Sequence, residues 1–262
     1  MIVFFFIISL AASTIGAVCG IGGGVIIKPL LDLLGAGPVP VVSFLSGSTV
    51  LAMSLYRVGK NVVSGEGEID LKLGTPLAIG AAVGGVLGKE LFSWLLRIFT
   101  DANRVGAIQA LCLLALTLGT LWYTLRKDRI RTHRMEGIGI AVGIGLFLGL
   151  LSSFLGIGGG PMNLVALFFF FSMDSKKAAN NSLYIILISQ IASLAYSFAT
   201  GTIPDFDRVD LLFMSLGGIL GGVLGARIHK RISQEGVDRM FVWLMLAIIA
   251  VCAFNIWRFS QM

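Results

Sequence analysis

Long apolar segments follow one another along the chain, separated by short polar or charged connections. Most are long enough for a helix that crosses the hydrocarbon core of a bilayer. The pattern predicts membrane helices at 2–19, 40–58, 71–96, 105–125, 137–155, 178–200, 209–228 and 238–258. Two apolar stretches, 25–35 and 161–172, are too short to cross at ~1.5 Å per residue, so they are interpreted as half-helices. The predicted fold is an all-α integral membrane protein.

Each half-helix directly follows a glycine cluster of the same sequence. Gly20 to Gly24 and Gly156 to Gly160 both read Gly-Ile-Gly-Gly-Gly, and Pro161 follows the second copy at once. Within a membrane, such a break exposes backbone N–H and C=O groups that lipid cannot satisfy, so it must be buried in protein or line a polar cavity. We therefore expect the two breaks to face each other near the membrane midplane.

The order of these features indicates an internal duplication. Gly84-Gly85-Val-Leu-Gly88 recurs at 221–225, and a tryptophan ends the last helix of each half. We predict two repeats in one membrane domain, 1–130 and 131–262, each with four spanning helices and one half-helix. If each half-helix crosses the membrane, a repeat has five passes and the repeats are inverted. If it dips in and returns, a repeat has four passes and the repeats are parallel. The distribution of charges favours inversion.

Composition and charge exclude a soluble protein and argue against a nucleic-acid partner. Of the 262 residues, 56% are hydrophobic and 13% are charged, about half the charged share of soluble domains. The net charge of +6 comes from basic residues in short loops beside the helices. Such residues report orientation, because cytoplasmic loops are enriched in Lys and Arg. The chain is therefore expected in the inner (cytoplasmic) membrane of a cell, with the basic loop 126–134 in the cytoplasm.

No pattern of catalytic, metal-binding or cofactor-binding residues is found in the sequence. Cys19, Cys112 and Cys252 lie in apolar runs without disulfide or metal spacing. His133 and His229 fall in basic stretches and are interpreted as solvated, and no carboxylate is expected deep within a span. The glycine clusters lack the preceding strand and the acidic residue of a dinucleotide site. We expect no enzyme activity, no cofactor and no metal.

The duplicated break is suited to holding an anion. A half-helix that starts at a glycine cluster presents unpaired N–H groups, and its aligned peptide dipoles add about half a positive charge there. Glycine lets a ligand reach the backbone, so two facing helix ends favour a small oxyanion. Lys28, four residues after the first cluster, is either a charge partner for the substrate or a side chain that reaches the interface.

Polar side chains near the breaks complete the candidate site. For the uncharged ones, hydrogen bonding between helices is the alternative role. The candidate substrate-binding residues are Gly22, Gly23, Gly24, Lys28, Ser46, Ser48, Thr49, Gly158, Gly159, Gly160, Asn163, Asn180, Asn181 and Tyr184.

The first cluster, followed by Lys28-Pro29-Leu30, together with the second cluster opening the C-terminal half, resembles the sulfite exporter (TauE/SafE) family over nearly the whole chain. The resemblance implies a bacterial or archaeal inner-membrane permease that moves sulfite, organosulfonates or related sulfur-containing anions, generally outward. Pro161 departs from a symmetric plan, which makes the two half-sites unequal.

We therefore expect a transporter that binds its anion between the two half-helices and works by alternating access. Protons or the membrane potential are candidate driving forces, and a homodimer is a candidate assembly. An anion channel and a membrane assembly protein without cargo are the alternatives.

Overall fold

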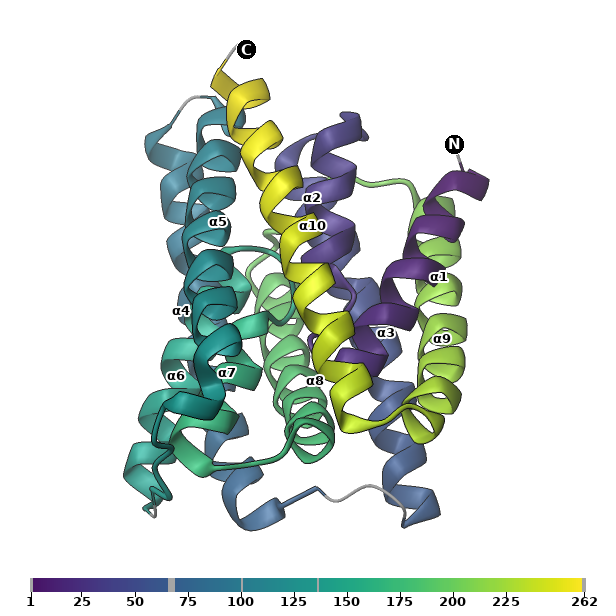
Figure 1. The fold of residues 1–262 in the computed structure, drawn as a ribbon. Helices are drawn as coiled ribbons and strands as arrows, with labels where there is room; N and C mark the ends of the chain where they lie inside the picture. Colours follow the sequence, from purple (N-terminus) through teal and green to yellow (C-terminus); the bar gives the residue numbers. More distant parts are fainter. Residues whose placement is uncertain (1, 66–68, 100, 136, 261–262) are drawn as a thin grey trace.

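The structure is a computed structural model that describes residues 2–65, 69–99, 101–135 and 137–260, and all regular structure within these ranges is helical. Figure 1 shows the helices packed side by side along one axis. In chain order they are α1 (Ile2–Cys19), α2 (Gly24–Leu34), α3 (Val39–Ser64), α4 (Leu71–Ile98), α5 (Ala102–Arg126), the 3₁₀ turn η1 (Lys127–Arg129), α6 (Ile138–Phe154), α7 (Pro161–Phe171), α8 (Ser175–Ala199), α9 (Arg208–Arg231) and α10 (Gln234–Ser260).

The expected all-helical membrane fold is confirmed, with two differences of extent. Helix α3 continues to Ser64, so the loop predicted from residue 57 starts later, and Arg57 is buried within the helix; residues 66–68 of that loop lie outside the described part. Helix α8 begins at Ser175, because the side chain of Asp174 accepts a hydrogen bond from the N–H of Lys177 and caps the helix before the predicted start.

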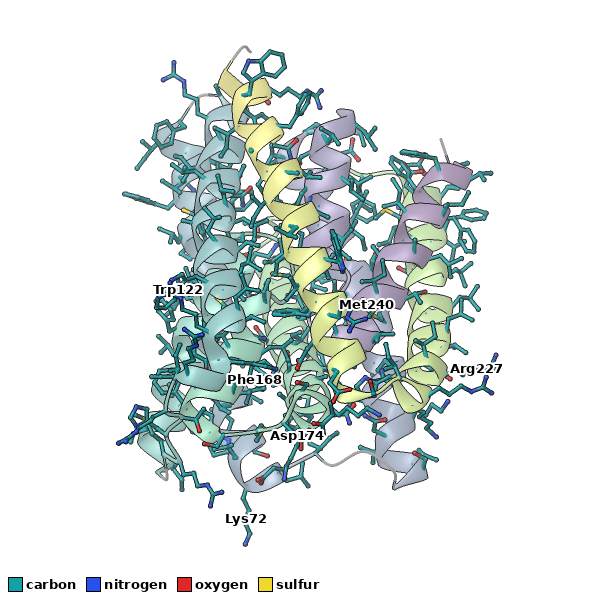
Figure 2. The ribbon with its side chains drawn as sticks, viewed as in Figure 1. Lys72, Trp122, Phe168, Asp174, Arg227 and Met240 are labelled. Atoms are coloured by element: carbon teal, nitrogen blue, oxygen red, sulfur yellow. The ribbon has the colours of Figure 1, made fainter. Side chains whose placement is uncertain are left out.

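Within the part of the chain that the structure describes, seven helices are long and apolar enough to cross a membrane, against eight expected from the sequence. Helix α6 has 17 residues and is shorter than these seven. The outer surface of the bundle carries large apolar side chains, among them Trp122, Phe147 and Trp243, as a lipid environment requires. In Figure 2, Trp122 projects from the side of the bundle, whereas Lys72 and Arg227 lie toward its lower end.

The short helices form two hairpins that enter the bundle from opposite ends (Figure 1). Helix α1 runs inward from the upper end and α2 returns there, and Phe5 of α1 and Leu31 of α2 belong to the same apolar cluster. Helix α6 enters from the lower end and α7 returns there, where the N–H of His133 donates to the carbonyl of Phe169 at 2.8 Å. In each hairpin the half-helix therefore runs back toward the end from which the preceding helix comes.

Each hairpin is held by a long helix that presents a stripe of glycines. Gly217, Gly221 and Gly225 of α9 lie in turn against Phe6, Leu10 and Thr14 of α1, so the two helices run parallel. In the same way Gly80, Gly84 and Gly88 of α4 lie against successive turns of α6. Small residues at this spacing let the two backbones approach closely, which is the main source of helix affinity in lipid.

A matched pair of substitutions in α6 tests this close packing. A methyl group at Gly145 would overlap the backbone carbonyl of Leu77, whereas one at Gly143 would meet no atom within 4 Å. We expect Gly145→Ala to cost about 1–3 kcal/mol, since the helices must separate, and to lower the melting temperature of the purified protein by several degrees. Gly143→Ala should leave the melting temperature unchanged or raise it slightly. Equal melting temperatures for the two variants would contradict the packing.

Candidate functional site: two facing helix breaks

The two glycine clusters fold into the same kind of turn. The backbone φ is +76° at Gly20 and +73° at Gly22, and it is +66° at Gly156 and +67° at Gly158. These left-handed values are costly for residues with a Cβ atom, which explains why glycine occupies the first and third place of each cluster. Both turns are buried, and each leads directly into a half-helix.

The structure brings the two turns into direct contact. A methyl group at Gly24 would overlap the carbonyl oxygen of Ile157, and one at Gly159 would lie 3.2 Å from the carbonyl oxygen of Ile21. Two apolar side chains flank the contact from α3 and α8. Val50 would lie 3.3 Å from a methyl at Gly22, and Ile186 is the first neighbour of Gly159. The two breaks therefore face each other inside the protein, far from lipid.

Like α3 and α6, the half-helices begin without a side-chain cap. Aspartates cap α4, α5, α8 and α9, whereas Gly23 and Gly160 stand at the N-cap positions of α2 and α7 and offer no side chain. Among the described residues, no backbone carbonyl accepts a hydrogen bond from the N–H of Gly22, Gly23 or Gly24. The unsatisfied N–H groups and the positive ends of the two helix dipoles therefore gather where the turns meet.

Buried polar side chains surround this contact. The hydroxyl of Ser43 would lie 2.6 Å from a methyl at Gly156, and that of Ser13 would lie 2.8 Å from one at Gly23. Neither hydroxyl has a hydrogen-bond partner, and the same holds for the side-chain oxygen of Asn163 in the first turn of α7. Ser46 lies 3.4 Å from the carbonyl oxygen of Gly24, and Gln190 is next to Gly158. Because buried polar groups are normally paired, this concentration of unpaired ones needs an explanation.

Lys28 neither reaches the interface nor stands free toward the turns. Its ammonium group donates to the carboxylate of Asp32 at 2.7 Å, and both side chains are about 95% buried. Asp32 lies in the half-helix, outside the segments predicted to cross the membrane, and its burial there was not anticipated. Asp32 follows Lys28 by four residues, which places both on one face of α2. That spacing was the sequence signal for the pair.

The remaining candidate residues lie away from the turns and connect helices. The hydroxyl of Thr49 donates to the carbonyl of Leu45 beside α9, and Ser48 is half-buried on another face of α3. The side chain of Asn180 accepts from Arg57 and Asn61.

Asn181 and Tyr184 link α8 to the start of α4. The side-chain oxygen of Asn181 accepts from the N–H of Asp70 at 2.9 Å, and the hydroxyl of Tyr184 lies 3.5 Å from that of Thr75. These contacts serve the alternative role considered for the polar residues, hydrogen bonding between helices.

His229 differs from its expected solvated state. It belongs to α9, is 6% exposed, and its Nδ1 lies 2.8 Å from the carbonyl oxygen of Val18 near the end of α1. The histidine therefore joins α9 to the first hairpin. It also borders a pocket of about 310 Å³ at the lower end, which Lys176, Lys177, Lys230 and Asn180 line as well.

The long apolar helices and the lipid-compatible surface together define a multi-pass membrane protein in which two helix hairpins face each other at their breaks. The model of the sulfite exporter TauE/SafE family matches residues 5–251, so the chain belongs to that family. This confirms the resemblance drawn from the glycine clusters and makes the protein a membrane transporter by family.

Similar proteins come from two bacteria. The chain is 24% identical over 258 residues to "Probable membrane transporter protein YunE" of Bacillus subtilis (strain 168), covering 88% of this chain and 89% of the relative. It is 24% identical over 255 residues to a "Probable membrane transporter protein" of Xylella fastidiosa, covering 91% and 88%. "Probable membrane transporter protein YdhB" of B. subtilis is 25% identical over 216 residues, covering 79% and 82%. No solved structure matches the chain.

The unpaired hydroxyls predict an unusual pattern of stability. Ser13→Ala and Ser43→Ala should change the free energy of unfolding by less than about 0.5 kcal/mol, since neither hydroxyl has a partner to lose. In Gln109→Met, by contrast, the carbonyl of Phe154 loses its 2.6 Å hydrogen bond. That variant should cost about 1–3 kcal/mol. Melting temperatures in detergent measure both effects. A loss for the serine variants as large as that for Gln109→Met would show that the serines hold the fold together.

Proposed function

We propose that the protein is a permease for small sulfur-containing oxyanions, such as sulfite or organosulfonates, and that the anion binds where the two half-helices begin. The observation that carries the proposal is the meeting of two uncapped helix N-termini among unpaired buried hydroxyls. Such a site supplies hydrogen-bond donors and partial positive charge from the backbone itself, which suits an anion with charge spread over several oxygens.

The residues proposed to contact the anion come from both hairpins and from α3. The backbone of Gly22, Gly23 and Gly24 faces that of Gly158, Gly159 and Gly160, with Ser13, Ser43, Ser46, Asn163 and Lys28 around them. Gly24 and Ile157 are in contact, so binding requires the two hairpins to move apart. Such a requirement suits a carrier, because the bound anion would stabilise a conformation in which the two turns are separated.

The helix arrangement supports two inverted repeats, 1–130 and 131–262, in one membrane domain. Helix α1 packs on α9 as α6 packs on α4, and α2 packs on α10 as α7 packs on α5. Each half then has one re-entrant hairpin and three full crossings. Because three is odd, the second half starts from the end opposite to the one where the first half starts, which inverts the two repeats. Rocking of one hairpin and then the other would expose the site alternately to each side.

The basic residues support an orientation with the lower end in the cytoplasm, in the inner membrane of a cell. The loop 126–134, Lys176, Lys177 and the last turn of α9 all lie at this end, as the positive-inside bias requires. The 310 Å³ pocket between Lys177 and Lys230 would then attract anions from the cytoplasm toward the site. An inside-negative potential would favour their export.

Binding can be tested by the thermal stability of the purified protein in the presence of sulfite, methanesulfonate and sulfate. We expect at least one of the first two to raise the melting temperature by a few degrees at about 100 times its dissociation constant. Ser43→Ala should bind the same anion roughly tenfold more weakly, because a donor to a charged group is lost. No stabilisation by any of these anions would contradict the proposal.

A matched control separates the site from general effects of losing a buried serine. Ser9 lies in α1, is fully buried, and donates to the carbonyl of Phe5 in its own helix. Ser9→Ala should keep the affinity of the original protein. In liposomes, saturable exchange of labelled anion would distinguish a carrier from a channel, which would give flux without exchange.

The orientation predicts which positions an impermeant thiol reagent can reach in whole cells. Gly37→Cys, at the upper end between α2 and α3, should react from outside, whereas Lys72→Cys at the lower end should react only after the membrane is permeabilised. The native cysteines lie within helices, and Cys19 and Cys252 are buried. The reverse labelling pattern would overturn the orientation.

A further inference from the structure

We propose that Asp32 takes up a proton when the substrate anion binds, because the anion competes with Asp32 for the ammonium group of Lys28. The inference rests on the proposed anion site and adds the ion to which binding is coupled. The protein would thereby bind one anion and one proton together, and the occupied site would carry the same net charge as the empty one.

The pair is built as an isolated, buried unit on a half-helix. The Nζ of Lys28 lies 2.7 Å from Oδ2 of Asp32, and the two side chains are 4% and 5% exposed. Another salt bridge joins Lys127 to Asp238 at the lower end, where both side chains are about one quarter exposed. A buried pair of this kind is a costly way to stabilise a membrane helix, so a functional role is the default reading.

A small cavity with several polar residues in its wall lies beside the pair. The cavity is about 10 Å³, close to the volume that one water molecule needs, and Gln109 of α5 and Asn255 of α10 line it together with the pair. The side-chain oxygens of Gln109 and Asn255 have no partner, while their nitrogens donate to the carbonyls of Phe154 and Pro29. Two unpaired acceptors next to an ammonium group with spare donors are suited to a bridging water.

Lys28 reaches from this cavity to the helix breaks. Its Cε would lie 3.3 Å from a methyl group at Gly156, so the lysine stem passes the first glycine of the second turn. Leu155 of that turn also lines the cavity. The rearrangement that we infer is a rotation about the side-chain bonds of Lys28 that carries its ammonium group from Asp32 toward the turns.

Asp32 cannot stay ionised at low cost once Lys28 has left. A buried carboxylate without a partner is strongly disfavoured relative to its protonated form. The charged and titratable groups that face the pair come from α10. Arg258 donates to the backbone carbonyls of Asp32 and Leu33, and Cys252 lines the cavity as a neutral thiol.

The described residues that α5, α1 and α3 place beside the pair or against α2 are uncharged. Helix α5 contributes the neutral Gln109, and α1 and α3 turn apolar residues toward α2, including Phe5, Ala12, Val42 and Leu45. The balance is that Lys⁺·Asp⁻, the anion and one proton from solution become Lys⁺·anion and neutral Asp32. No bond other than the O–H bond of Asp32 forms.

The second hairpin has no equivalent pair. Counted from the last glycine of each cluster, Lys28 and Asp32 correspond to Leu164 and Phe168 of α7, which are both buried and apolar. Packing of the half-helix therefore does not itself require a charge pair, and only the first hairpin would carry the proton.

The test is calorimetric titration of the purified protein with methanesulfonate, whose charge does not change over the pH range used, and separately with sulfite, corrected for its own protonation. Titrations in buffers of different ionisation enthalpy count the protons taken up. At a pH where Asp32 starts ionised, we expect one proton to be taken up per anion bound. Under those conditions the affinity for the anion should fall about tenfold for each unit by which the pH is raised.

Two variants assign the proton to Asp32. Asp32→Asn should bind without proton uptake and with an affinity that no longer depends on pH. Because it leaves Lys28 without a counter-ion, the double variant Lys28→Gln/Asp32→Asn serves if the single one does not fold, and it should bind weakly and again without protons. Glu235→Gln, an exposed carboxylate in the first turn of α10, is the control that should keep the uptake.

The outcomes separate this inference from the proposed function. If the original protein binds the anion without proton uptake, the inference is overturned and the anion site is kept. This result is expected if Arg258 takes the place of Lys28 beside Asp32 and keeps its carboxylate ionised. Proton uptake that persists in Asp32→Asn also overturns it. No binding of either anion by the original protein overturns the proposed function, and this inference with it.

Discussion

The structure depends on one constraint, which is that a backbone polar group inside a membrane must find a partner within the protein. Six of the ten described α-helices, α3, α4, α5, α8, α9 and α10, have both ends at the surface of the bundle, whereas α1, α2, α6 and α7 meet at two breaks in its interior. The structure satisfies the constraint by packing the breaks against each other and surrounding them with α3 and α8. Some of the groups that stay unsatisfied, the N–H groups of Gly22 to Gly24 and the hydroxyls of Ser13 and Ser43, lie at this place. A ligand that forms hydrogen bonds with these groups would remove the free-energy cost of leaving them unsatisfied.

Most of the fold could be predicted from the sequence because membrane helices have a strong compositional signal. The ends of α1, α2, α6 and α7 fall within about two residues of the predicted bounds, since the glycine clusters interrupt the apolar runs sharply. The end of α3 was missed because Arg57 and Lys60 look like the start of a polar loop. Arg57 is in fact buried and bonded to Asn180 across the interface with α8. Such a partner lies more than 100 residues away and leaves no local trace.

The candidate site was predictable only in its backbone. The glycines could be recognised from the sequence, because a left-handed backbone conformation at two places in each cluster requires glycine. The side chains around the turns do not, since a serine in an apolar run can face either a neighbouring helix or a cavity. Ser13 and Ser43 lie at the turns, while Thr49, Asn181 and Tyr184 bond elsewhere. Which face of a helix meets the break depends on tertiary packing, and the order of residues alone does not determine it.

The parallel packing of each hairpin on a distant glycine-striped helix has a consequence for biosynthesis. Helix α6 emerges after its partner α4, so it can dock as soon as it enters the membrane. Helix α1 is made first, yet the stripe that receives it begins at Gly217, more than 200 residues later. At roughly 5–20 residues per second of translation, α1 waits on the order of 10–40 s with its interior serines and the following glycines uncovered. Until α9 has been synthesised, the first hairpin of the nascent chain therefore needs a transient packing partner, which is either lipid, the insertion machinery or another membrane protein.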